Sequence, residues 1–189
     1  MLNGLKIPSI LSLIVIGCVA VSSVFAFACS GEPETRSVAG RNIEVHTGFP
    51  VVIDSAFYKG TDGKTWVITP SASNRQLIVM KPTIVNRTST VIPLLVDTEA
   101  ASIGDRRSRR FPAVDPISKA RSVSVSLEET PTVKDISPIL WGDVELPRQT
   151  QVEGYIVFDV PKGVILGTLF WDEIEYFPID FIDYWKKRD

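Results

Sequence analysis

The sequence has little cysteine and histidine, and this scarcity limits the chemistry that the chain can carry out. Its two cysteines, Cys18 and Cys29, lie near the N-terminus, and His46 is the single histidine among 189 residues. From residue 30 onward the chain has no thiol for a disulfide, a metal site or a nucleophile. One histidine without a cysteine also excludes the usual zinc sites. We expect no metal and no cofactor.

An excess of positive charge is also absent. The chain has 20 basic and 22 acidic residues, and its formal net charge is −2 at pH 7. A nucleic-acid binder with a global basic field is therefore excluded, and we expect no nucleic-acid partner. Long apolar runs are absent outside residues 7–28, which excludes a membrane protein with several spans. The remaining length suits one domain with an ordinary hydrophobic core.

Residues 1–28 differ from the rest of the chain because Lys6 is their only charged side chain. As a helix rising about 1.5 Å per residue, residues 7–27 would extend about 31 Å, which is enough to cross the hydrocarbon core of a membrane. Lys6 precedes this run and Glu32 follows it, so the N-terminus should stay in the cytosol and the body should be exported. We therefore predict a signal peptide or a membrane anchor.

Three outcomes remain open for this leader. Residues 26–28 read Ala-Phe-Ala, a pattern that a signal peptidase could cut, and this cut would place Cys29 at the new N-terminus. Cys29 could then carry a lipid, the body could be secreted without one, or the leader could stay as an uncleaved anchor. Lipidation at Cys18 is rejected because it would leave an apolar stretch outside the membrane. All three outcomes place the body outside the cytoplasm, with residues 29–41 as a flexible tether and residues 42–189 as one domain.

Beyond the tether, short apolar runs alternate with turn residues, which is typical of β-strands. Asp62-Gly63 predicts a hairpin turn, and residues 161–163 predict a short hairpin loop. Residues 76–85 are apolar on both faces, which predicts one central buried strand. Residues 99–119 are expected to be irregular. The expected strands are residues 43–46, 51–58, 65–69, 76–85, 91–96, 122–128, 151–160, 164–170 and 174–181.

This pattern predicts an all-β fold, an antiparallel β-sandwich of about seven to nine strands behind an N-terminal signal or anchor helix. Two segments also carry a resemblance to a known family. Residues 75–88 (RQLIVMKPTIVNRT) resemble its opening strand and N-x-[ST] motif, and residues 152–161 (VEGYIVFDVP), after Leu146-Pro147, resemble its G-x-[LIV]-[VL]-F-x-V-P block. Over about residues 48–181 the chain thus resembles the immunoglobulin-like family called domain of unknown function 4352.

That family is common on bacterial lipoproteins and is similar to the secreted mycobacterial immunoprotective antigen fold. Residues 104–112 depart from the D-x-x-G-x-x-[FY] hairpin of the family. The resemblance implies an immunoglobulin-like sandwich on an exported protein of the cell envelope. It implies no catalytic residue.

Three groups of residues are candidates for catalysis or metal binding. Residues 60–65 end in Gly-Lys-Thr, but the first glycine of a phosphate-binding loop is missing and a strand follows, so a hairpin turn is favoured. His46 has no G-x-S-x-G nucleophile motif to act with anywhere in the sequence, and it is expected at a surface or strand edge. Paired carboxylates could hold calcium or hydrolyse a glycoside, but a solvated face is favoured. The carboxylates concerned are Asp172, Glu173, Glu175, Asp180 and Asp183.

The sharpest local charge is formed by Arg106, Arg107, Arg109 and Arg110. Four guanidinium groups could bind phosphates, lipid headgroups or an acidic polymer, whereas the alternative is a solvated hairpin tip. Among the four tryptophans, Trp66 and Trp171 are expected to pack in the core. Trp141 follows a proline-containing loop and is the candidate for ligand contact. The alternative is that the four tryptophans, Trp185 included, form a platform on which a sugar ring stacks.

Three classes of function follow from these patterns. The leading hypothesis is a non-enzymatic, envelope-anchored module that binds an unknown protein or envelope polymer. The second is a lipoprotein that binds a small ligand or carbohydrate through Trp141, and an exposed aromatic cleft would favour it. The third is a carboxylate-dependent hydrolase, which would need two carboxylates facing one pocket.

Overall fold

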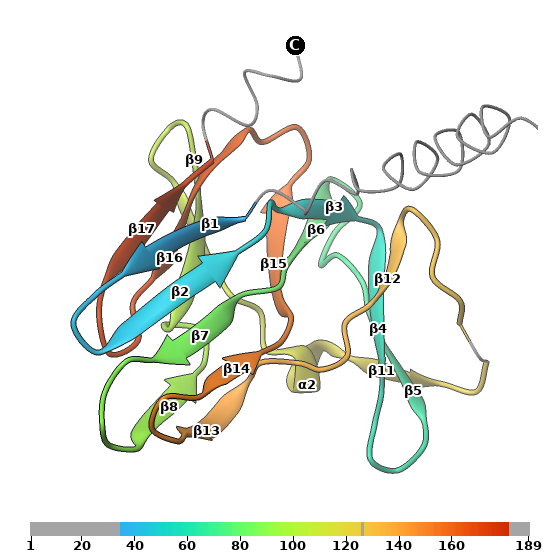
Figure 1. Ribbon diagram of the computed structural model, residues 1–189. Coiled ribbons are helices and arrows are strands. Elements are labelled where there is room, and N and C mark those ends of the chain that lie inside the picture. Colours follow the sequence, from blue (N-terminus) through green and yellow to red (C-terminus); the bar gives the residue numbers. More distant parts are fainter. Residues whose placement is uncertain (1–34, 126, 182–189) are drawn as a thin grey trace, which may run out of the picture. The chain divides into compact units, whose positions relative to one another are not determined.

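The protein folds almost entirely into β-strands (Figure 1). The structure, a computed structural model, describes residues 35–125 and 127–181. Seventeen strands and one short helix, α2 (Pro116–Lys119), are formed by this part of the chain. All strand pairs are antiparallel except the parallel pair of β12 (Val133–Asp135) with β4 (Ser55–Lys59). The prediction of an all-β antiparallel fold is confirmed.

The strands form four sheets and one further pair. The first sheet has the order β1 (Arg36–Ala39), β2 (Ile43–Thr47), β7 (Thr83–Asn86), β14 (Gln151–Glu153). The second has the order β10 (Arg110–Pro112), β9 (Ala101–Asp105), β16 (Leu166–Trp171), β17 (Phe177–Asp180). The central sheet is β15 (Ile156–Pro161), β6 (Arg75–Met80), β3 (Val51–Ile53), and the side sheet is β11 (Arg121–Val123), β5 (Thr65–Ile68), β4, β12. The separate pair is β13 (Gly142–Leu146) with β8 (Ile92–Val96).

Two hydrophobic clusters are buried on opposite faces of the β6–β15 pair. Because successive side chains of a strand point to opposite faces, both faces of these strands are covered. Ile78, Met80 and Phe158 belong to the larger cluster, whereas Leu77, Val79 and Val157 belong to the smaller one beside the side sheet. The prediction that this segment is buried on both faces is confirmed for β6.

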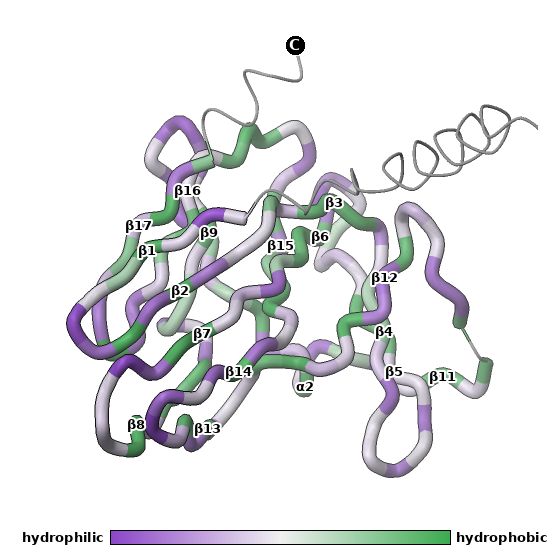
Figure 2. The backbone as a smooth tube through the Cα atoms, in the orientation of Figure 1, coloured by the Kyte–Doolittle hydropathy of each residue, from purple (hydrophilic) through white to green (hydrophobic). Residues whose placement is uncertain are grey.

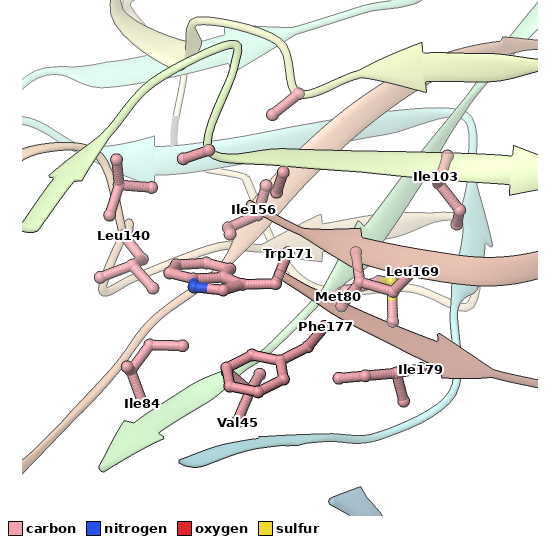
Figure 3. Packing of buried hydrophobic residues seen from close by; sticks show 14 of the residues in the cluster. Val45, Met80, Ile84, Ile103, Leu140, Ile156, Leu169, Trp171, Phe177 and Ile179 are labelled. Carbon is pink, nitrogen blue, oxygen red and sulfur yellow. The ribbon is translucent and has the colours of Figure 1, made fainter. Parts of the chain in front are cut away.

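Trp171 is fully buried and lies within the larger cluster (Figure 3), between Ile156 and Phe177. Its indole Nε1 donates a hydrogen bond to the Glu173 carbonyl at 2.9 Å, so the one polar atom of the ring is satisfied. The expectation that Trp171 packs in the core is confirmed. In Figure 2 hydrophobic segments lie along β3, β6 and β15, and the turn between β1 and β2 is hydrophilic.

The structure has more strands than predicted because several predicted strands are broken into two. Residues 76–85 divide at Pro82, which cannot donate a hydrogen bond to a ladder, so β6 joins the central sheet and β7 joins the first sheet. Residues 151–160 divide opposite it, at Gly154, whose amide donates to the Pro82 carbonyl at 3.3 Å. Residues 51–58 divide at Asp54 into β3 and β4. The pairing of β6 and β7 with β15 and β14 is thus bent in the middle, and its two halves belong to two different sheets.

Other expected boundaries also differ. Residues 99–119, expected to be irregular, contain β9, which lies between β10 and β16 in the second sheet. Residues 161–163 do not close a hairpin, because β15 and β16 belong to different sheets. Strand β11 is short and Val125 is exposed, so residues 122–128 do not form the expected half-buried strand. Strand β17 begins at Phe177 and not at residue 174, where the φ angle of 67° interrupts an extended chain.

Strands β1, β12 and β13 were not expected. Strand β1 lies within the range 29–41 that the sequence assigned to a tether, and it pairs with β2 from Arg36 opposite Thr47 to Ala39 opposite Glu44. Its residues alternate between half-buried and exposed, so it is an edge strand with a weak apolar signal. The ordered domain therefore begins several residues before residue 42.

Candidate functional site

An aromatic groove of about 570 Å³ opens beside the side sheet. Tyr58 and Trp66 come from the paired strands β4 and β5, and Trp141 comes from the segment before β13. Ile117 of helix α2 is 67% exposed and lies on the same groove. The rest of the lining is Lys59, Gly60, Thr61, Asp62, Ser137, Pro138 and Ile139. Segments distant in sequence thus converge on one concave, mainly apolar surface.

The β4–β5 hairpin positions Trp66. Its turn contains Gly63 at a φ of 75°, a conformation that favours glycine, and Asp62 Oδ1 accepts a hydrogen bond from the Lys64 amide at 3.1 Å. The hairpin predicted from Asp62-Gly63 is confirmed. Trp66 Nε1 lies 3.4 Å from Asp62 Oδ1, and a Cβ atom added at Gly60 would be 2.6 Å from that nitrogen. Gly60 therefore leaves the space in which the indole of Trp66 lies.

Backbone hydrogen bonds hold the segment that carries Trp141. The Leu140 amide donates to the Tyr155 carbonyl at 3.0 Å, and the Tyr155 amide donates to the Pro138 carbonyl at 2.8 Å. Leu140 is buried in the larger cluster, and Trp141 is half-buried and packs against that cluster. The backbone just before Trp141 is hydrogen-bonded, and the Trp141 ring is partly packed against the larger cluster. The ring that lines the groove is therefore held in a fixed position.

Polar groups at the groove have defined charge states. Tyr58 Oη donates a hydrogen bond to the Pro116 carbonyl at 3.3 Å, and burial together with the charges of Asp115 and Asp62 raises the pKa of the phenol. The amide of Lys64 and the indole of Trp66 lower the pKa of Asp62 despite some desolvation. At neutral pH the groove therefore presents a neutral phenol and the carboxylate of Asp62, and the side chain of Lys59 also lines it. Asp62 is the only carboxylate among the lining residues.

The tryptophans are distributed differently from the prediction. Trp66, expected in the core, is half-exposed and lines the groove, because its strand lies in the side sheet over a smaller cluster that does not cover it. Trp141, the predicted ligand contact, lines the same groove. Trp185 lies outside the described residues. The sequence analysis did not predict that Tyr58 and Trp66 line a groove. The one feature that pointed to this position is that Trp66 lies close to the predicted Asp62-Gly63 turn.

The four arginines occupy the turn between β9 and β10 and its edge, and they are not equivalent. Arg109 forms an ion pair with Asp105, with both Nε and a terminal nitrogen 2.6 Å from Oδ2. The guanidinium of Arg110 stacks 3.7 Å from the ring centre of Phe170 and donates to Tyr176 Oη at 3.0 Å. Arg106 and Arg107 are exposed, and neither forms an ion pair with a carboxylate of the described residues.

A second cavity, of about 350 Å³, lies between this turn and the β15–β16 loop. The Arg106 amide donates to the Ile165 carbonyl at 3.2 Å, which joins the two segments. Arg106, Arg107 and Lys162 line the cavity together with Asp105, whose charge is balanced by Arg109. The structure thus brings two of the four predicted arginines together with a lysine that the sequence did not single out.

Two carboxylates of residues 172–180, Glu173 and Glu175, accept backbone hydrogen bonds, and no group of metal-binding side chains occurs in the part of the chain that the structure describes. Glu175 accepts hydrogen bonds from the amides of Arg41, Asn42 and Ile43 at 3.0–3.1 Å, in the turn between β1 and β2. Glu173 accepts one from the Leu95 amide at 3.1 Å. Asp183 lies outside the described residues. Glu173 and Glu175 therefore lie in a loop with backbone partners, and the expected exposed strand face is wrong here.

His46 lies on β2, where its Nε2 is 3.0 Å from a carboxylate oxygen of Glu44. Its side chain is partly exposed, in keeping with the expected surface position. Cys18, Cys29 and the leader lie outside the described residues. No helix formed by residues 35–125 and 127–181 is long and apolar enough to cross a membrane.

No family model and no curated protein matches the sequence. Among solved structures, the crystal structure of a candidate lipoprotein, ycdA, from Bacillus subtilis is similar, with a TM-score of 0.47 and 14% sequence identity. The similarity covers 78% of this chain and 39% of that chain, so this chain spans well under half of the length of that protein. The resemblance to domain of unknown function 4352 stays a prediction.

Proposed function

We propose that this protein is an exported, membrane-tethered binding module that binds a carbohydrate in the aromatic groove. The observation that carries the proposal is the convergence of Tyr58, Trp66 and Trp141 on one groove of about 570 Å³. A groove of this size and apolar character is typical of a small-ligand site. The groove favours the second class of function derived from the sequence over a closed module without a concave surface.

A carbohydrate suits this lining better than a purely apolar ligand. The face of a pyranose ring presents C–H groups, which complement the negative face of an aromatic ring, and its hydroxyl groups require polar partners. Lys59 and Asp62 supply a donor and an acceptor at the rim of the groove. Asp62 Oδ1 accepts from the Lys64 amide and the Trp66 indole, and its Oδ2 lies 3.4 Å from the Lys64 ammonium. A carboxylate has about four lone-pair positions, so Asp62 retains acceptor capacity for a hydroxyl.

The proposal assigns binding and no catalysis. Glycoside hydrolysis uses two carboxyl groups, commonly about 5–10 Å apart and facing the scissile bond. The groove is lined by the single carboxylate of Asp62, whose pKa is lowered, whereas a general acid needs a raised pKa. A binding role therefore agrees better with the electrostatics of the groove than a carboxylate-dependent hydrolase does.

The tether is the second part of the proposal. The charge-free run of residues 7–28 supports export, and Cys29 after an Ala-x-Ala pattern supports a lipid anchor. Fractionation of cells that express the full chain would test this part. We expect the protein in the membrane fraction and expect Cys29→Ser to release it; retention of Cys29→Ser in the membrane would favour an uncleaved helical anchor.

The groove is tested by titration with soluble oligosaccharides of glucose and of N-acetylglucosamine, followed by tryptophan fluorescence and calorimetry. The chain used starts at residue 30 and keeps both hydrophobic clusters, which are formed by residues 38–181. We expect Trp141→Ala and Trp66→Ala each to weaken binding about tenfold or more, as loss of a central aromatic anchor does. Tyr176→Ala is the matched control, because Tyr176 is an exposed aromatic residue outside the groove. The proposal fails if no oligosaccharide binds or if the control loses affinity equally.

A further inference from the structure

We propose that the end of the domain formed by Arg106, Arg107 and Lys162 docks on the anionic surface of the membrane to which the chain is tethered. We call these three residues the basic end. The inference rests on the tether proposed above, because the tether determines which end of the domain comes close to the membrane. It is independent of the groove and of any carbohydrate.

The basic end is preformed by two loops that contact each other. The hydrogen bond from the Arg106 amide to the Ile165 carbonyl fixes the β9–β10 turn against the β15–β16 loop. Asp105 Oδ1 accepts from the amides of Arg107 and Arg109 at 2.8 and 2.9 Å, so the turn is held from within. The side chains of Arg106 and Arg107 are exposed on this rigid turn, and Lys162 is exposed beside them. Three cations are thus held together with little ordering left to occur on binding.

The neighbouring charges leave these three cations uncompensated. Asp105 is balanced by Arg109, and Asp159, near the start of the β15–β16 loop, is balanced by Arg75 at 2.8 Å. In Figure 2 the β9–β10 turn is a hydrophilic tip of the domain. The local field is therefore positive although the whole chain has a net charge of −2.

An apolar side chain lies at the edge of the same cavity. Ile165 is 49% exposed and lines it together with Arg106 and Lys162. Cations beside an exposed aliphatic group suit the boundary between lipid headgroups and acyl chains, where phosphates and methylene groups are both within reach. A soluble acidic polymer would use the cations but gain less from Ile165.

The chain enters the domain at this same end. Strand β1 runs from Arg36 towards Gly40, where an added Cβ atom would be 2.6 Å from the Phe177 ring at the start of β17. Strand β17 runs back along β16, with Asp180 opposite Thr168, and Leu166 lies opposite Asp105. The start of strand β1 therefore lies towards the end of the domain that carries Asp105 and the basic end (Figure 1).

The tether is short, so it limits how far the start of β1 can lie from the membrane. From Cys29 to Arg36 the chain can reach roughly 23–25 Å when fully extended, at about 3.3–3.6 Å per residue. Electrostatic attraction to an anionic leaflet acts within about one Debye length, roughly 8–10 Å at physiological salt. A lipid at Cys29 would keep the end that contains Arg36 within reach of the surface, and the basic end lies towards that end of the domain.

Flotation with lipid vesicles tests the proposal on the chain that starts at residue 30, which lacks the lipid and the leader. The vesicles are pure phosphatidylcholine or phosphatidylcholine with 30% phosphatidylglycerol. The variant combines Arg106→Ser, Arg107→Ser and Lys162→Ser. Its matched control, Lys119→Ser with Arg121→Ser and Arg148→Ser, removes the same charge from exposed residues outside the basic end. Thermal melts check that both variants fold.

We expect the parent chain to bind the anionic vesicles, not the neutral ones, and to be released by salt. The basic-end variant should bind about a hundredfold more weakly, because each cation near an anionic surface contributes about the same favourable increment. The control should stay within about threefold of the parent. Equal losses in both variants, or no binding of the parent to anionic vesicles at low salt, would overturn the proposal.

Three further measurements separate the possible failures. Binding of the parent chain to a soluble glycerol-phosphate polymer, with no binding to vesicles, would assign the basic end to a wall polymer and overturn membrane docking. Titration of the basic-end variant with oligosaccharides reports on the groove alone and should match the parent. Fractionation of Cys29→Ser reports on the tether alone. A failed docking experiment is thereby distinguishable from a failed groove or a failed anchor.

Discussion

Arg109 and Asp105 form an ion pair in which both Nε and a terminal nitrogen of the guanidinium lie 2.6 Å from Oδ2 of the carboxylate. The Asp105 side chain is 3% exposed, and its other oxygen accepts hydrogen bonds from the amides of Arg107 and Arg109. One of the four arginines in this segment is therefore a structural partner and is not available to a ligand. The pair closes the turn that presents Arg106 and Arg107.

Replacing Asp105 should destabilise the domain and change its response to acid. Burial tends to raise the pKa of Asp105, but hydrogen bonds from Arg109 and Arg107 and the charge of Arg109 outweigh it and lower the pKa overall. A lowered folded-state pKa contributes stability above the usual value of about 3.9, and this contribution is lost as pH falls through the lowered pKa. Asp105→Asn should reduce the unfolding free energy by about 1–3 kcal/mol near pH 7.

Urea unfolding between pH 2 and pH 7 checks this prediction. The difference between the parent and Asp105→Asn should shrink as the pH falls, because the parent loses its carboxylate there. Asp143→Asn is the control, since Asp143 is exposed on β13. A difference that stays constant across this range would show that the ion pair does not contribute through its charge.

Replacing Glu175 should loosen the turn between β1 and β2. Desolvation tends to raise the pKa of Glu175, whereas three backbone amides and the charge of Arg41 lower it, and the net shift is downward. Glu175→Gln should destabilise the domain by about 1–3 kcal/mol at pH 7, because amide donors lose a charged acceptor. Hydrogen exchange should be faster at the amides of Asn42 and Ile43. Unchanged exchange there, with Glu145→Gln as the exposed control, would contradict the assignment.

Replacing Asn86 should be costly because its side chain joins two loops. It is 1% exposed, and its Nδ2 donates to the carbonyls of Thr90, Leu146 and Pro147, whereas its Oδ1 accepts from Thr88. Asn86→Ala leaves these buried groups without partners, so we expect a loss of about 2–4 kcal/mol in unfolding free energy. Asn74→Ala, at an exposed site, should change it by less than about 0.5 kcal/mol. Similar losses in the two variants, measured by urea unfolding, would refute this role.

Two tryptophans should respond differently to truncation. Trp171→Ala removes a fully buried indole and should cost about 3–5 kcal/mol. Trp66→Ala removes a half-exposed ring at the groove and should cost less than about 2 kcal/mol. Chemical unfolding of both variants measures the contrast. Equal costs would mean that Trp66 supports the fold as much as Trp171 does and would weaken its assignment to a binding surface.

Local patterns were sufficient for the all-β class, the burial of β6 on both faces, the Asp62-Gly63 turn and the burial of Trp171. These features depend on side-chain periodicity and turn chemistry, which neighbouring residues encode. The strand predicted over residues 122–128 was wrong because alternation of apolar and polar residues does not show whether a partner strand is present. Strand β9 was missed because its small residues give a weak apolar signal, although its neighbours β10 and β16 pair with it on both sides.

Three features follow from composition or short-range pattern and could be read from the sequence alone: the apolar leader with Lys6 as its one charge, the absence of thiols beyond residue 29, and the all-β class. Which residues lie next to one another in the fold could be read only from the three-dimensional structure. Trp66 and Trp141 line one groove, Arg106 lies beside Lys162, and Glu175 binds the turn that starts at Gly40. These contacts depend on strand order and on the break at Pro82, where the paired strands divide between two sheets. Long-range pairing of this kind has no local signature, because the chain must fold before the partners become neighbours.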